Sequence, residues 1–141
     1  MEPRLSLVTL SVADLALARA FYEGLGWTRR VQGAEGVAFY QLGPLALSLY
    51  PRTDLAADAG VPAEGSGFRG FSLAHNVGSR AEVDIVVARA AAAGGAVVAP
   101  PSEKSWGGYS GYVADPDGTL WEIAWNPLFP LDASGSLTLP G

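Results

Sequence analysis

The sequence contains no cysteine and only one histidine, His75. Without cysteine the chain can form neither a disulfide framework nor a thiolate metal site. Charge is sparse as well: 16% of the residues are charged, the net charge is −5, and the lysines and arginines are scattered. We therefore expect no nucleic-acid partner, because the chain lacks the concentrated basic surface that binds a phosphate backbone.

Long apolar runs are also missing. No run approaches the roughly 20 residues that a membrane-spanning helix needs, and residues 1–13 show no signal-peptide pattern. We expect a cytoplasmic protein with no membrane partner. At 141 residues, of which 49% are hydrophobic, the chain is long enough to bury a proper core.

The first half alternates strand and helix signals. Residues 5–12 are rich in strand formers, and Asp14 is placed to cap a helix that ends at Gly24 or Gly26. The apolar face of this helix is predicted to hold Leu17, Ala18, Phe21 and Leu25. Two further strands are predicted over 36–42 and 45–50, joined at Gly43-Pro44.

The second half repeats this order. A strand is predicted over 70–77, and Ser79 with Glu82 forms a capping box for a helix that stops at Gly94-Gly95. Strands follow within 95–101 and within 108–127. The repeated β-α-β-β-β unit predicts an α+β fold of two tandem modules. We predict one domain over 1–127, in which module 1 covers about 4–51, a linker with about one turn of helix covers 52–67, and module 2 covers about 68–127. The tail 128–141 follows this domain.

One carboxylate lies in the middle of an apolar, aromatic-rich strand. The segment "DPDGTLWEIAWNP" (115–127) predicts a tight turn and then a strand containing Glu122. Alternation puts Leu120, Glu122 and Ala124 on one face, and Trp121, Ile123 and Trp125 on the other. The aromatic face should pack on a helix. Because an unpaired buried carboxylate is costly, the Glu122 face should meet water or a polar cavity.

Two motifs resemble those of the vicinal oxygen chelate superfamily, the group of glyoxalases, bleomycin-resistance proteins and extradiol dioxygenases. They are V-A-D-L-x-x-x-x-x-F-Y-x-x-L-G-W at 12–27 and D-P-D-G-x-x-W-E at 115–122. The resemblance covers residues 5–127. It implies that each module curls its sheet into half of a barrel, with helices outside and a concave cup for the ligand. It also implies that the metal enzymes of the group hold their ion at the positions of Leu7, Leu47, Ser72 and Glu122.

Only Glu122 among these four positions carries a good metal ligand. Leucine offers a cation nothing, and a neutral serine hydroxyl is a poor ligand for zinc or iron. His75 lies an odd number of residues from Ser72, so alternation turns it toward the helix side or the sheet edge, where a packed histidine is the simpler interpretation. We therefore predict no resident metal and no cofactor.

The predicted cup wall follows from alternation. It is mostly apolar, with small hydroxyls, one amide and one carboxylate, which suits a small organic molecule. Trp106 and Tyr109 belong to the glycine-rich stretch "KSWGGYSGY", where they either stack on a bound molecule or cap the domain interface. The predicted wall consists of Leu7, Thr9, Ser11, Leu47, Leu49, Ser72, Ala74, Asn76, Leu120, Glu122 and Ala124, with Trp106 and Tyr109 beside it.

Two kinds of function fit this cup. The first is metal-independent binding of a small organic molecule, similar to the antibiotic-sequestering branch of the superfamily. The second is a lyase or isomerase of the same superfamily, with or without a divalent metal, in which Glu122 acts as general base. Glu122 as a purely structural, hydrogen-bonded carboxylate is a third interpretation of that residue. Because relatives with this layout commonly pair across a two-fold axis, we also predict a symmetric homodimer.

Overall fold

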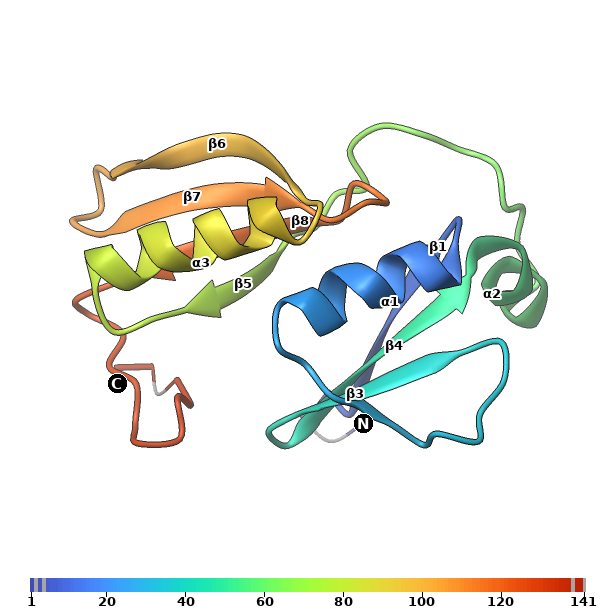
Figure 1. Ribbon diagram of the computed structural model, residues 1–141. Coiled ribbons are helices and arrows are strands. Elements are labelled where there is room, and N and C mark those ends of the chain that lie inside the picture. Colours follow the sequence, from blue (N-terminus) through green and yellow to red (C-terminus); the bar gives the residue numbers. More distant parts are fainter. Residues whose placement is uncertain (2, 4, 138, 141) are drawn as a thin grey trace. The chain divides into compact units, whose positions relative to one another are not determined.

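The computed structural model describes every residue except 2, 4, 138 and 141. The chain divides into two compact units, Met1–Arg69 and Gly70–Gly141. Each unit contains one four-stranded mixed sheet with a helix packed on it (Figure 1). The α+β class and the repeated module are confirmed. No helix in the described part of the chain is long and apolar enough to cross a membrane.

The first unit has the strand order β1-β4-β3-β2. Its elements are β1 (Leu7–Val12), α1 (Leu15–Gly24), β2 (Arg29–Arg30), β3 (Ala38–Leu42), β4 (Leu45–Pro51) and α2 (Arg52–Ala59). Strands β1 and β4 run parallel, with Thr9 opposite Ser48, and β3 pairs antiparallel with β4. The short strand β2 was not predicted, because a pair of arginines carries no apolar alternation.

The second unit has the equivalent order, β5-β8-β7-β6. Its elements are β5 (Leu73–Asn76), α3 (Arg80–Ala92), β6 (Ala96–Glu103), β7 (Tyr109–Ala114) and β8 (Leu120–Trp125). Strand β6 continues through two prolines that the prediction placed at its end. Proline removes a backbone donor, which an edge strand tolerates, and the pairing of β6 with β7 shifts register at these residues.

Local capping interactions set the helix starts as predicted. The Asp14 carboxylate accepts a hydrogen bond from Leu17 N at 3.0 Å. Ser79 Oγ accepts from Glu82 N at 3.2 Å, and Glu82 Oε2 reaches back to Gly78 N at 2.7 Å. These bonds satisfy backbone donors that a helix start leaves open.

The linker begins with a longer helix than predicted. Residues 52–59 form helix α2, eight residues long, rather than about one turn. Pro51 immediately precedes the helix, Asp54 places a negative charge in its first turn, and Gly60 ends it in the left-handed conformation with φ 69°. The polar, glycine-containing composition of 52–67 is typical of a loop, so these helix signals did not lead to a helix prediction.

The core of each unit lies between its sheet and its helix. In the first unit the buried stripe of α1 is Ala18, Phe21 and Tyr22, while Leu17 is 57% exposed, which corrects its predicted place on the buried face. In the second unit α3 buries Val83, Val87 and Ala90. We call the side of each sheet that contacts α1 or α3 its helix face, and the opposite side its far face.

Candidate functional site

In the first unit, strand register identifies the residues of each face. Tyr40 of β3 contacts Tyr22 of α1, with ring centroids 6.2 Å apart, so Tyr40 lies on the helix face. Leu47 pairs with Tyr40 and therefore shares that face, as does Leu49, two residues further. Both leucines are almost fully buried. Their predicted place on the cup wall beside Thr9 was wrong, because β4 is offset by one residue from the register that alternation alone suggested.

The far face of the first unit contains hydroxyl groups instead. Ser48 Oγ donates a hydrogen bond to Thr9 Oγ1 at 2.7 Å, which places both side chains on this face. Ser48 is only 2% exposed. Leu7 and Ser11 follow the phase of Thr9, and Leu7 is 41% exposed.

Ser48 in the first module and Glu122 in the second occupy equivalent positions, counted along the last strand from the residues opposite Leu7 and Ser72. Leu7 pairs with Ala46, and Ser48 lies two residues further along β4. In the second unit, Leu73 pairs with Trp121. One residue earlier along both strands, Ser72 therefore lies opposite Leu120, and Glu122 lies two residues beyond Leu120. The first module therefore presents Ser48, rather than Leu47, where the second presents Glu122.

In the second unit, contacts with α3 define the helix face. The Tyr109 hydroxyl donates to Asp84 Oδ1 of α3 at 2.9 Å, and the Arg80 guanidinium lies 4.2 Å above the Trp125 ring. Alternation along β8 then puts Trp121 and Ile123 on the same face, as predicted. Tyr109, however, is the first residue of β7 and points to α3, so its predicted place in a flexible loop beside the ligand was wrong.

Glu122 lies on the far face of the second unit, between two neighbouring strands. Its cross-strand neighbours are Ala74 on β5 and Tyr112 on β7. Burial and the negative charge of Glu122 raise the pKa of the Tyr112 hydroxyl, while its hydrogen bond with Ser72 acts in the opposite direction. Glu122 is half-buried, and no lysine, arginine or histidine in the described part of the chain forms an ion pair with it.

Tyr112 was not among the predicted site residues, although the hairpin turn points to it. Asp115 Oδ1 accepts from Asp117 N at 2.9 Å and from Thr119 N at 2.8 Å, which closes the turn between β7 and β8. Counting outward from a closed turn pairs Tyr112 with Glu122. Ser110, next along this face, is 1% exposed, and its Oγ has no hydrogen-bond partner among the described residues.

The remaining predicted wall residues of the second unit lie in the phase of Glu122. Asn76 pairs with Ala124 at the far end of β5, and Ser72 lies just before that strand. His75 pairs with Ile123, so it lies on the helix face, away from Glu122. Burial lowers the pKa of the His75 imidazole, although this edge-strand side chain keeps contact with solvent. His75 therefore has the place that alternation predicted.

Trp106 lies in the turn between β6 and β7 and packs on Gly108. A Cβ atom at Gly108 would come 1.7 Å from the Trp106 ring and 2.5 Å from the Trp125 carbonyl oxygen. Only glycine fits in this place. The indole is 44% exposed and keeps a free surface for contact with a further molecule.

A pocket of about 440 Å³ borders the far face of the first unit at Ser11. Arg69 Nη1 donates to Ser11 Oγ at 3.1 Å, and the Arg52 guanidinium donates to the carbonyl oxygens of Ala63 and Gly65. The other lining residues are apolar and come from α2 and the segment after it: Leu55, Ala56, Ala59, Val61, Pro62 and Ala63. The sequence did not identify this pocket, because its parts are far apart along the chain.

The residues at the implied metal positions do not fit a metal ion. Leu7 and Leu47 offer no donor atom, Ser72 offers a neutral hydroxyl, and Leu47 lies on the wrong face. Among the described residues, no three His, Cys, Asp or Glu side chains gather closely enough to hold an ion. No step of a metal mechanism is therefore derived from these residues.

Two modules with the same strand order, each with a parallel pair of first and last strands, define a paired β-α-β-β-β protein. Residues 4–123 match the family model of the Glyoxalase/Bleomycin resistance protein/Dioxygenase superfamily. The chain belongs to this superfamily, which confirms the resemblance seen in its two motifs.

Solved structures of the same family have this fold. A glyoxalase-related enzyme from Fulvimarina pelagi is 38% identical to the chain, with 99% of each chain covered and a TM-score of 0.88. A lactoylglutathione lyase from Agrobacterium tumefaciens is 24% identical, with 88% of this chain and 94% of that one covered and a TM-score of 0.66. The fosfomycin resistance protein FosX from Mesorhizobium loti is 19% identical, with 91% and 95% covered and a TM-score of 0.66. Comparison with curated proteins gave no match.

Proposed function

We propose that this protein binds a small organic molecule on the far faces of its sheets, without a metal ion. The observation that carries the proposal is Glu122, a half-buried carboxylate on the far face of β8 whose charge no described cation balances. Such a group fits a ligand that brings its own positive charge or hydrogen-bond donor. The neighbouring hydroxyls of Tyr112 and Ser72 supply further polar contacts.

The far face of the first unit supports the same proposal. Its pocket beside Ser11 combines apolar walls with two guanidiniums, and its volume of about 440 Å³ suits a small molecule. Thr9 and Ser48 satisfy each other, so this part of the face is chemically neutral. Leu47, Leu49 and Tyr109 are left out of the proposed ligand contacts, because all three belong to helix faces. The contacts that remain in the proposal are Leu7, Thr9, Ser11, Ser72, Ala74, Asn76, Trp106 and Glu122, together with Tyr112 and Arg69.

A second candidate function is a lyase or isomerase reaction in which Glu122 removes a proton next to a carbonyl group. The observation that favours it is the Tyr112 hydroxyl, which neighbours Glu122 and is protonated at neutral pH, as any tyrosine of ordinary or raised pKa is. A protonated hydroxyl can donate to the oxygen on which negative charge develops. Lactoylglutathione lyase, a protein of the same fold, gives this reaction class a first substrate to test.

The test is a single substitution, Glu122→Gln, which keeps the shape and removes the charge. Native mass spectrometry of the purified protein would identify a retained ligand, and calorimetric titration with bleomycin, fosfomycin and S-lactoylglutathione would supply defined probes. For a cationic ligand we expect the variant to lose roughly 1–3 kcal/mol of binding free energy. Glu64→Gln, an exposed carboxylate in the loop after α2, is the matched control and should leave binding unchanged.

The outcomes separate the interpretations of Glu122. Loss of turnover with unchanged affinity would favour the general base, and a changed melting temperature with unchanged affinity would favour a structural carboxylate. If affinity, turnover and melting temperature all stay the same, Glu122 has none of these roles. Elemental analysis that finds about one metal ion per chain, removable with loss of binding, would contradict metal independence.

We further propose that the protein acts as a symmetric homodimer. Two copies that present the same surface to each other close the assembly, so a two-fold arrangement is the simplest one for a chain of this kind. The tail 128–141 matches neither module, and α2 with the following loop lies outside the repeated unit, so both are candidates to contact the partner. Light scattering that gives the mass of a single chain at micromolar concentration would contradict this proposal.

A further inference from the structure

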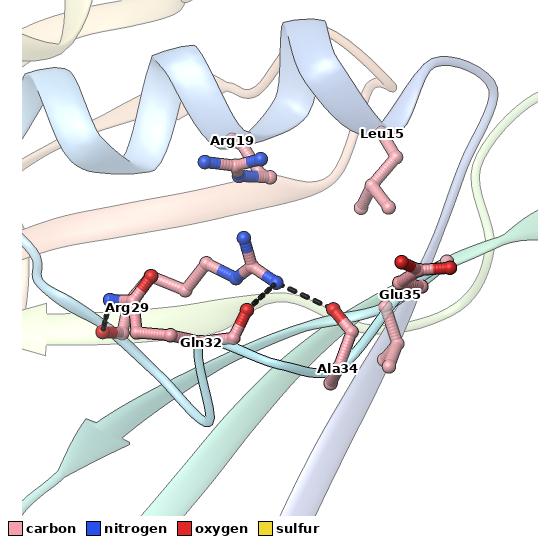
Figure 2. Close-up of a pocket in the computed structure, with 8 residues that line it drawn as sticks. Leu15, Arg19, Arg29, Gln32, Ala34 and Glu35 are labelled. Atoms are coloured by element: carbon pink, nitrogen blue, oxygen red, sulfur yellow. Dashed lines mark hydrogen bonds between the residues drawn. The ribbon is translucent and has the colours of Figure 1, made fainter.

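A second pocket lies in the first unit, on the helix-face side and apart from the far-face residues of the proposed ligand site. It has a volume of about 300 Å³ and lies between α1 and the segment from β2 to β3. Figure 2 shows its lining side chains, with two arginines at one end and a carboxylate at the other. We call it the arginine pocket. It is lined by Leu15, Arg19, Arg29, Gln32, Ala34, Glu35, Gly36 and Val37.

Arg29 is held in a fixed orientation by the loop that follows it. Its Nη2 donates to the carbonyl oxygens of Gln32 at 3.3 Å and Ala34 at 2.6 Å, and the Gln32 side chain returns a hydrogen bond to Arg29 O at 2.9 Å. Val31, within this loop, has φ 50°. A β-branched residue seldom adopts that conformation, so the packed arrangement maintains a strained backbone here.

The guanidinium of Arg29 is left without a counter-charge. No carboxylate in the described part of the chain forms an ion pair with it. Its Nε is buried and has no hydrogen-bond partner among the described residues. A buried donor without an acceptor is costly, and two hydrogen bonds to neutral carbonyls do not offset a positive charge.

Arg19 brings a second positive charge to the same end of the pocket. Its Nε bonds Glu23 Oε1 at 3.2 Å, which anchors the side chain along α1. Figure 2 shows the two guanidiniums facing each other across the pocket, while Glu35 lies at the opposite end beside Leu15. Because Glu23 already pairs with Arg19, an anion between the two guanidiniums would balance the charge of Arg29.

We propose that the arginine pocket binds a small oxyanion, a carboxylate or phosphate group, between the guanidiniums of Arg19 and Arg29. Guanidinium groups bind such oxygens through paired N–H donors, and the orientation of Arg29 is set before the anion arrives. The apolar side chains of Leu15 and Val37 leave room for a short carbon skeleton attached to the anion. Glu35 favours a hydroxyl or amino group at the other end of that skeleton.

The test measures anion binding to the intact protein, independently of any enzymatic activity. Sodium phosphate and sodium acetate are titrated separately, with sodium chloride at equal ionic strength as the screening control. The ¹H–¹⁵N resonance of the Arg29 Nε–H reports occupancy directly, and the melting temperature reports it by linkage. We expect the resonance to move with phosphate or acetate and to stay in place with chloride. A stronger response to one of the two identifies a phosphorylated or a carboxylated ligand.

Charge variants locate the effect. Arg19→Gln should weaken anion binding about tenfold, the size of one lost charged hydrogen bond. Arg30→Gln removes the same charge from the next residue of β2 without lining the pocket, and it should leave affinity unchanged. Glu35→Gln should tighten binding, because it removes a like charge from the pocket.

Several results would overturn the proposal. They are the absence of any response to phosphate and acetate, an equal response to chloride, and an equal loss of affinity in Arg19→Gln and Arg30→Gln. Because Arg29 also holds the loop, its replacement can disturb folding. Arg19 is 37% exposed and bonds the side chains of Glu23 and Tyr40 rather than the loop, so its replacement avoids that difficulty.

Discussion

The two units have the same strand order but contain different chemistry at equivalent positions. Ser48 in the first unit and Glu122 in the second lie at the same count along the last strand of the module, on the far face. Ser48 is buried and bonds its neighbour Thr9, so the pair is neutral and satisfied. Glu122 is half-buried and neighbours Tyr112. The shared backbone therefore fixes which face a side chain occupies, while the residue present in each module determines whether that position is neutral or charged.

Exchanging the two residues tests this difference between the units most directly. Ser48→Glu would place a carboxylate in a buried site whose only described polar partner is the Thr9 hydroxyl, and we expect it to lower the free energy of unfolding by roughly 3 kcal/mol. Glu122→Ser should change it by less than about 1 kcal/mol, because this side chain keeps contact with solvent. Urea unfolding monitored by tryptophan fluorescence measures both.

Ser48→Ala is the control for this exchange. It removes the hydrogen bond to Thr9 without adding charge or volume, and it should cost about 1 kcal/mol. Equal losses in Ser48→Glu and Ser48→Ala would mean that the site accepts a carboxylate, and the contrast between the two units would then disappear.

A smaller effect concerns pH, since only the second unit contains a histidine. Burial holds the pKa of His75 below its ordinary value of 6.5, so between these values the unfolded chain binds more protons than the folded one. The stability associated with neutral His75 is therefore complete above pH 6.5 and decreases as the pH falls through the folded-state pKa. Melting temperatures of the wild type and of His75→Gln across this range should converge in acid and separate above it. Parallel curves would contradict a lowered pKa.

The interactions that the sequence predicted well are those between residues close along the chain. Asp14, Ser79 and Glu82 cap helix starts within four residues, and Asp115 closes its turn with donors two and four residues away. Alternation within one strand also separated Glu122 from the tryptophans correctly. Such patterns need no knowledge of what packs against the segment.

The errors occurred where the prediction needed the position of one strand against another. Leu47 and Leu49 follow an apolar alternation that suits either face of the sheet. Only the pairing of β4 with β1 and β3 assigns them to α1, and a slip of one residue exchanges the two faces. Tyr109 was misplaced for a similar reason, because a glycine-rich segment concealed the start of a regular strand.

Local residue patterns predict the repeated module, the helix caps, the turn before β8 and the isolation of Glu122 among apolar residues, because each depends on local geometry and a short period. Which residues share a site depends instead on how distant segments pack together. Arg69 bonds Ser11 across 58 positions and Thr9 bonds Ser48 across 39, while Arg19 and Arg29 line one pocket because the loop after β2 lies beside α1. These contacts depend on long-range register and loop packing, for which no local pattern of residues provides a signal.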